Sequence, residues 1–214
     1  MEKSLVEQIK EQFSEETILG KEWFENPSVY EREIITGVKW QTTRYGHHAL
    51  DRHSPYKQGQ LTCIIGHTNV GKSTFIIYLL SQLLAEKKII IYSAENRISQ
   101  IARWLIAFHW HEHDYAKYFA WLRERVMFIR HAKQFTYKEV LEQASISDDI
   151  GFNADALLID PYNALKMERG RNGHEYHYEA IEDMRIFTAQ TKKSIFLNCH
   201  TVTESQRTRK DQDG

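Results

Sequence analysis

The chain has 214 residues, 42% of them hydrophobic and 27% charged, a composition typical of one large globular domain. Its 28 Lys and Arg against 29 Asp and Glu give a formal net charge of −1, which excludes a globally basic nucleic-acid coat and a polyanionic tail. A chain with a net charge near zero can still contain a basic patch, so only local clusters of basic residues can indicate nucleic-acid binding here. The two cysteines, Cys63 and Cys199, each lie inside an apolar run, which predicts two buried thiols in a reducing compartment.

The amino-terminal residues lack an apolar signal core, and no stretch approaches the roughly 18 to 20 apolar residues that a membrane span needs. We therefore expect a soluble, cytoplasmic protein without a membrane partner. Leu5, Ile9 and Phe13 recur at helical spacing before Gly20 and predict a short amphipathic helix. Such a helix packs either on its own domain or on a neighbouring subunit, and its pattern does not distinguish the two.

From residue 61 onward, short apolar runs alternate with longer helical patterns, which predicts an α/β fold with a mainly parallel sheet and helices on both faces. Each run is continuously apolar, as expected for strands that are covered on both faces. Thr136 and Glu139 form a capping box that opens one of the helices. The predicted strands are residues 61–65, 89–93, 126–129, 157–160 and 194–199, and the predicted helices are 73–86, 97–111, 136–144 and 175–192.

Residues 66–73 read Gly-His-Thr-Asn-Val-Gly-Lys-Ser, a full match to the phosphate-binding pattern G-x-x-x-x-G-K-[ST] between a predicted strand and a predicted helix. In such a loop the backbone amides and the helix N-terminus face the phosphates, Lys72 neutralises the β and γ oxygens, and the Ser73 hydroxyl ligates magnesium. The sequence therefore predicts binding of ATP and Mg²⁺. The predicted nucleotide contacts are Gly66, His67, Thr68, Asn69, Val70, Gly71, Lys72, Ser73 and Thr74.

Two carboxylates at the ends of other strands complete the predicted site. Asp160 ends an apolar run and is expected to hold the magnesium ion together with Ser73; the alternative is a capping role before Pro161. Because a proline follows Asp160, the carboxylate that activates water must come from elsewhere. Glu95, just past the strand at 89–93, is the candidate general base, and the alternative is that it stabilises the N-terminus of the next helix.

A fourth strand ends in a polar pair, Asn198 and His200. At the same edge of a parallel sheet as the phosphate loop, His200 is predicted to sense the γ-phosphate and to relay its loss, although a lone histidine is more often structural. Two basic stretches also follow predicted strands. They carry Lys166, Arg169 and Arg171 in the first and Arg207, Arg209 and Lys210 in the second.

This ensemble resembles the RecA-like motor domain of hexameric replicative DNA helicases of the DnaB and Twinkle types, over roughly residues 37–214. The resemblance implies that the strand ending in His200 lies between the phosphate-loop strand and the Asp160 strand, and that ATP binds at a subunit boundary of a hexameric ring. It also implies that single-stranded DNA threads the ring and meets the two basic stretches. The alternative is that the two basic stretches are ordinary solvent-exposed loops, which have a similar charged composition.

By the same resemblance, residues 1–30 are a linker that latches one subunit onto the next. Residues 31–214 are the ATPase domain, which ends before the strand that carries the family's arginine finger. Partners would include primase or other replication proteins in a bacterial or phage-infected cell. Two other functions stay open: a RecA- or RepA-like DNA-dependent ATPase, and a nucleotide-binding loader or regulatory module without productive hydrolysis.

Overall fold

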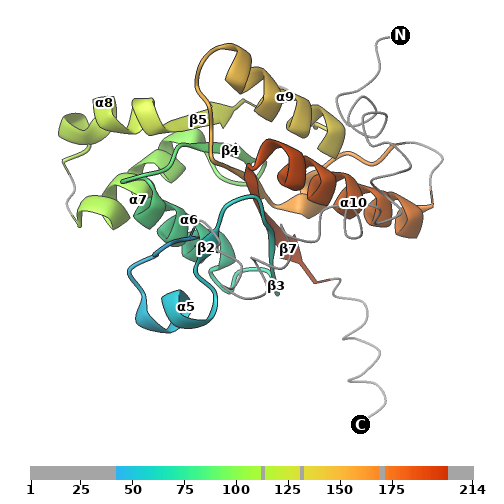
Figure 1. The fold of residues 1–214 in the computed structure, drawn as a ribbon, viewed down its shortest axis with the longest axis horizontal. Helices are drawn as coiled ribbons and strands as arrows, with labels where there is room; N and C mark the ends of the chain where they lie inside the picture. The colour runs from blue at the N-terminus through green and yellow to red at the C-terminus, as the bar shows by residue number, and fades with distance from the viewer. Residues whose placement is uncertain (1–41, 112–113, 131–132, 169–171, 202–214) are drawn as a thin grey trace, which may run out of the picture.

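A computed structural model describes residues 42–111, 114–130, 133–168 and 172–201, and Figure 1 shows their fold. Five strands form one sheet in the order β3-β7-β6-β4-β5, and every neighbouring pair is parallel. The predicted α/β class is therefore confirmed, and β7 lies between β3 and β6 as the resemblance implies. The strands are β3 (Leu61–Gly66), β4 (Ile89–Ser93), β5 (Val126–Ile129), β6 (Ala156–Asp160) and β7 (Ser194–His200).

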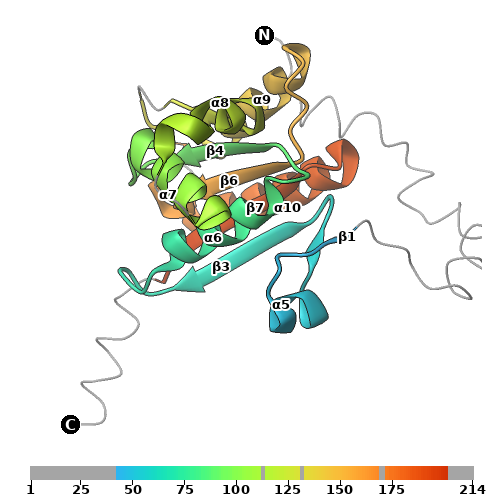
Figure 2. The same cartoon turned by 90° about the vertical axis from the view of Figure 1, so that its left-hand side faces the viewer.

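Helices cover both faces of the sheet (Figure 2). Successive strand residues point to opposite faces, so Ile90 and Tyr92 of β4 join the core under α9 and α10, whereas Ile89 and Ile91 join the core under α6, α7 and α8. Among the described residues, no helix has both the length and the apolar character that a membrane span requires. The helices are α6 (Lys72–Leu83), α7 (Ile98–Trp110), α8 (Tyr115–Arg125), α9 (Tyr137–Asp149) and α10 (Gly173–Thr191).

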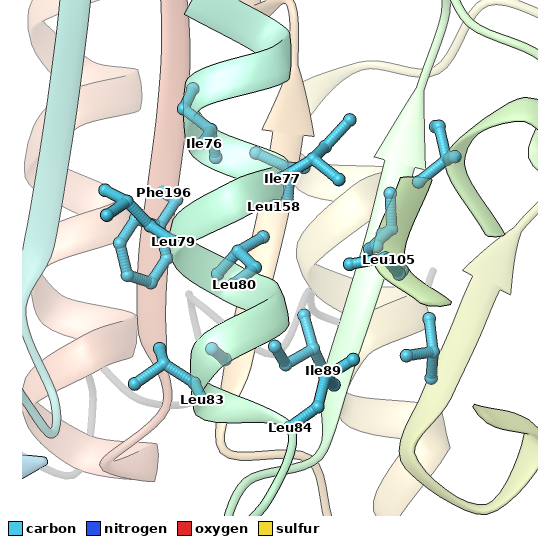
Figure 3. Packing of buried hydrophobic residues seen from close by; sticks show 14 of the residues in the cluster. Ile76, Ile77, Leu79, Leu80, Leu83, Leu84, Ile89, Leu105, Leu158 and Phe196 are labelled. Atoms are coloured by element: carbon cyan, nitrogen blue, oxygen red, sulfur yellow. The ribbon is translucent and has the colours of Figure 1, made fainter. Parts of the chain in front are cut away.

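Helix α6, which follows the phosphate-binding sequence, is buried along most of its length. Its side chains Ile77 and Leu80 are fully buried in a cluster that includes Leu105 of α7, Leu158 of β6 and Phe196 of β7 (Figure 3). Burying a leucine or isoleucine side chain contributes about 1.5–3 kcal/mol. The start of α6 is therefore held firmly against the sheet, and this positions the loop before it.

Strand β3 departs from the sequence-based expectation. Its apolar run predicted burial on both faces, but β3 is an edge strand, and Thr62, Cys63 and Ile65 are exposed, the last at 67%. The prediction that Cys63 is buried is therefore wrong, and Cys199 on β7 is only partly buried. The cause is the place of β3 in the sheet, since an edge strand lacks a neighbour on one side.

Several short elements were not predicted. Residues 42–57, for which no helix or strand was predicted, contain a two-stranded antiparallel ribbon and a short helix, and α8 lies where no helix was expected. Helix α9 runs to Asp149 rather than ending near residue 144. The short elements that were not predicted are β1 (Thr42–Thr43), α5 (His48–His53), β2 (Tyr56–Lys57) and the 3₁₀ turn η1 (Tyr162–Ala164).

The predicted capping box is present at the start of α9. The Thr136 hydroxyl accepts a hydrogen bond from the Glu139 backbone N–H at 3.2 Å, and the Glu139 carboxylate accepts one from the Thr136 N–H at 2.8 Å. We expect Thr136→Ala to lower the free energy of unfolding by about 1 kcal/mol, because a helix N–H loses its acceptor. Urea unfolding followed by circular dichroism measures this, and Thr136→Ser, which keeps the hydroxyl, should unfold close to wild type. Equal losses in both variants would contradict the capping role.

Candidate active site

The phosphate-binding sequence forms a turn between β3 and α6, and its two glycines serve different purposes. Gly71 is the residue before α6 and has φ +87°, a left-handed conformation that strains any other residue. At Gly66, a Cβ atom would lie 3.3 Å from Cδ of Lys72, so the glycine leaves room for the lysine side chain. Asn69 also adopts positive φ, at 62°. The loop thus turns sharply onto the N-terminus of α6, where backbone N–H groups favour an anion.

Lys72 lies within reach of two groups at the same edge of the sheet. Its Nζ donates a hydrogen bond to the His67 carbonyl at 2.5 Å and lies 3.4 Å from Nδ1 of His200. Because an ammonium group can only donate, this contact is a hydrogen bond in the tautomer of His200 whose Nδ1 is the acceptor. The Nε2 atom of the same ring lies 3.4 Å from a carboxylate oxygen of Glu95, close enough for attraction but without hydrogen-bond alignment. His200 therefore sits between the lysine and the half-exposed glutamate.

Asp160 is fully buried, and its carboxylate is surrounded by donors from three other parts of the fold. Ser73 at the start of α6 donates at 2.9 Å, Ser93 at the end of β4 at 3.3 Å, and the Asn96 side chain at 3.2 Å. The Asn198 side chain of β7 donates to the same carboxylate and, at 3.0 Å, to the Ser73 hydroxyl. A capping role before Pro161 does not describe this position, since the side chain of Asp160 faces the phosphate loop.

The pairing of Ser73 with Asp160 fits a magnesium site. Hydroxyl and carboxylate oxygens are ligands that Mg²⁺ prefers, and this ion keeps most of its other positions for water and phosphate oxygens. The side-chain oxygen of Asn198 is buried beside this pair and has no hydrogen-bond partner among the described residues. The donor set thus suits a hard cation that sits between the protein and a nucleotide.

A cavity of about 450 Å³ lies above these groups and falls in the size range of ligand sites. The structure therefore brings most of the predicted nucleotide and catalytic residues to one place. Buried Asp160, exposed Val70, and the residues Gly66 and His67 are not among those that line this cavity. The lining residues are Thr68, Asn69, Gly71, Lys72, Ser73, Thr74, Glu95, Asn96, Trp104 and His200.

Sequence reasoning missed Ser93, Asn96 and Trp104. Ser93 ends β4 and Asn96 lies in the turn that follows it. That position is the signal that could have found them, because the carboxyl ends of parallel strands share one edge. Asn96 also anchors its own turn, since its backbone N–H donates to the Ser93 hydroxyl at 3.2 Å. This turn carries Glu95, so Asn96 links the position of Glu95 to Asp160.

Of the six predicted DNA-binding residues, Lys166 is the only one placed; Arg169, Arg171, Arg207, Arg209 and Lys210 lie outside the described residues. Lys166 is exposed, and its backbone is fixed by a bond from its N–H to the Phe135 carbonyl at 2.8 Å and from the Tyr176 hydroxyl to its own carbonyl at 2.9 Å. The side chain of Lys166 is thus presented to solvent from an anchored segment.

The fold has close parallels among solved structures. One solved ATPase domain superposes with a TM-score of 0.65 at 13% identity, over 84% of this chain and 71% of that one. The chain has the RecA-like ATPase fold. A DnaB-like replicative helicase, whose structure was described together with its interactions with primase, gives a TM-score of 0.66 at 11% identity and covers 88% of this chain. This RecA-like chain spans about half, 49%, of that helicase.

A KaiC-like protein of the archaeon Pyrococcus horikoshii OT3 is also similar, with a TM-score of 0.56 at 17% identity over 76% of this chain and 72% of that one. No protein-family model matches the sequence, and no curated protein matches it. At identities of 11–17% the likeness shows the RecA-like fold alone, and the function depends on the residues of the site.

Asn96 provides a test of the site's construction. Asn96→Ala removes one donor from the buried Asp160 carboxylate, and a hydrogen bond to a charged group contributes about 1.5–3 kcal/mol. We expect the Mg²⁺ concentration that half-saturates nucleotide binding to rise roughly tenfold or more, as measured by titration with a fluorescent ATP analogue. Gln100→Ala, an exposed change on the first turn of α7, is the control. An unchanged Mg²⁺ requirement in Asn96→Ala would contradict the positioning role.

Proposed function

We propose that the chain is the motor domain of an ATP-dependent replicative DNA helicase, which hydrolyses ATP at subunit interfaces to move along single-stranded DNA and unwind duplex. The observation that carries this proposal is the placement of His200 between Lys72 and Glu95 at the mouth of the phosphate loop. A module that only bound nucleotide would have no need of a carboxylate held there.

In the proposed reaction each group has a separate task. The loop amides and Lys72 bind the β and γ oxygens, and Glu95 accepts a proton from the attacking water. His200 lies 3.4 Å from both Lys72 and Glu95. When the γ-phosphate leaves, Lys72 returns to its contacts with the His67 carbonyl and His200, and in this way His200 senses the loss of the phosphate. Mg²⁺, held by Ser73 and Asp160, would neutralise charge that develops on the transferred phosphoryl group.

An apolar groove supports the proposed subunit association. It has a volume of about 680 Å³, lies between α7, α8 and β5, and contains Phe119, which is 54% exposed. The exposed arginines Arg97, Arg123 and Arg130 lie along the groove, and no described acidic residue pairs with them. The segment 1–30, outside the described residues, combines an apolar stripe with several glutamates. We propose that this segment of a neighbouring copy occupies the groove in a hexameric ring.

The remaining proposed partners are single-stranded DNA, contacted by Lys166, Arg169, Arg171, Arg207, Arg209 and Lys210, and primase or other replication proteins. The place of action would be the cytoplasm of a bacterial or phage-infected cell. The exposed Lys166 supports the first contact, since it extends from the same edge of the sheet as the nucleotide site. Basic side chains of this kind track a phosphate backbone with salt-dependent affinity.

A RecA- or RepA-like DNA-dependent ATPase is the second candidate, and the KaiC-like neighbour shows that the same fold is not limited to helicases. Electron microscopy with DNA separates the two, because a filament lengthens with the DNA and a ring does not. A loader or regulatory module would bind ATP without productive hydrolysis.

Substitutions in the site test the catalytic part of the proposal. Lys72→Ala should abolish ATP binding, whereas Glu95→Gln should bind ATP normally and lose at least about 100-fold in turnover, the usual contribution of a general base. Glu124→Gln, on the exposed surface of α8, is the matched control and should hydrolyse at the wild-type rate. Normal hydrolysis by Glu95→Gln would eliminate the base assignment.

The dependence of hydrolysis on protein concentration tests the shared site. We expect the specific ATPase rate to rise with protein concentration and to be stimulated by single-stranded DNA at low salt, because an interface site forms only when subunits meet. Steady-state phosphate release at several concentrations, with and without DNA, measures both effects. Intact ATP binding with flat, negligible hydrolysis would favour the loader or regulatory module instead.

A further inference from the structure

The two cysteines of the chain lie on neighbouring strands at the edge of the sheet. In the parallel pairing of β3 and β7, Cys63 is the partner of Leu197 and Ile65 is the partner of Cys199. Because side chains alternate between faces along a strand, Cys63 and Cys199 point to the same face, one diagonal step apart. Figure 2 shows β3 at one edge of the sheet, and Cys63 on this strand is exposed.

Each thiol affects the pKa of the other. A hydrogen bond from the Cys199 thiol lowers the pKa of Cys63 to about 7, although partial burial acts in the opposite direction. The same hydrogen bond, together with burial, raises the pKa of Cys199. The thiolate form of Cys63 is therefore favoured relative to that of an ordinary cysteine, and the thiolate is the form that reacts with oxidants and alkylating agents.

Both strands lead directly into the nucleotide site. β3 continues from Cys63 to Gly66 at the start of the phosphate loop, and Cys199 stands between Asn198, a donor to Asp160, and His200. The Lys72 ammonium is close enough to act electrostatically on the Cys199 thiol. A covalent change at this pair of thiols would therefore alter the strand ends on which the site is built.

We propose that Cys63 and Cys199 are an oxidation site at which a peroxide forms an intrachain disulfide that weakens nucleotide binding. The Cys63 thiolate attacks one peroxide oxygen, and the O–O bond breaks to give the sulfenic acid and hydroxide. The Cys199 thiol then attacks the Cys63 sulfur; the S–S bond forms, and the hydroxyl group leaves with a proton as water. In sum, two thiols and hydrogen peroxide give one disulfide and two waters.

The geometry explains why this bond would affect the site. A diagonal step between neighbouring parallel strands separates Cα atoms by about 8 Å, from a strand spacing near 4.8 Å and a rise near 3.3 Å per residue. Disulfides usually span about 4.4–6.8 Å. Closing the bond must therefore slide the end of β3 against β7, and the edge position of β3 permits this movement. The displacement would reach Gly66 and His200.

The first experiment oxidises the full chain with hydrogen peroxide and then measures intact mass and the affinity for a fluorescent ATP analogue. We expect loss of the mass of two hydrogen atoms, a cross-linked Cys63–Cys199 peptide, and affinity at least about tenfold weaker that dithiothreitol restores. Cys63→Ser and Cys199→Ala should bind the analogue normally before and after peroxide. A Cys63 sulfinic acid without the cross-link, or a cross-linked chain with unchanged affinity, would overturn the proposal.

The second experiment follows alkylation of Cys63 by iodoacetamide against pH. In wild type the rate should rise through about pH 7. In Cys199→Ala the rise should move toward the ordinary thiol value near 8.5, because the hydrogen bond that stabilises the thiolate is gone. Cys199→Ser keeps a donor and should retain the low inflection. The same profile in all three proteins would show that the two side chains do not interact and would overturn the proposed pairing.

Discussion

The carboxylate of Asp160 is the group on which the arrangement of the site depends. A buried charge is costly unless donors surround it, and the described donors here are all uncharged: the hydroxyls of Ser73 and Ser93 and the amides of Asn96 and Asn198. These donors come from α6, from the end of β4 and its following turn, and from β7. Satisfying one carboxylate therefore fixes the relative positions of the three elements that also carry Lys72, Glu95 and His200. The hydrogen bonds that build the site therefore also hold the ends of the strands in place relative to one another.

The strands that can be predicted from sequence are those whose apolar run coincides with burial. β4 and β6 are buried at every position, and their runs identify them within a residue. The apolar run of β3 gave the same prediction of burial, yet β3 lies at the edge of the sheet. Its edge position could not be predicted from the run, because the order of strands depends on long-range crossovers that no local pattern encodes. Helix α8 was missed for a different reason: Tyr118 and Leu122 are its only buried residues, too few to produce a recognisable apolar stripe.

In the site, the sequence predicts which residues come together but not how the turns between them orient each side chain. Parallel strands end at a common edge, so polar residues that follow apolar runs, such as Glu95, Asp160 and His200, could be expected to converge. The structure adds that Asn96 reaches back to Asp160 while its neighbour Glu95 faces the cavity. This choice depends on the turn after β4 and on the bond from the Asn96 N–H to Ser93, which a sequence pattern does not specify.

His200 also connects the nucleotide site to the segment that follows Asp160. Its backbone N–H donates to the Asn163 side chain at 2.8 Å, and Asn163 lies in η1, which leads to Lys166. The hydroxyl of Tyr162, in the same turn, lies 2.9 Å from Nδ1 of His177 at the start of α10. The residue that touches Lys72 is thus bonded to the segment proposed to meet DNA. A motor needs such continuity, because a change at the phosphate can produce movement elsewhere only if the elements between them are packed and bonded together.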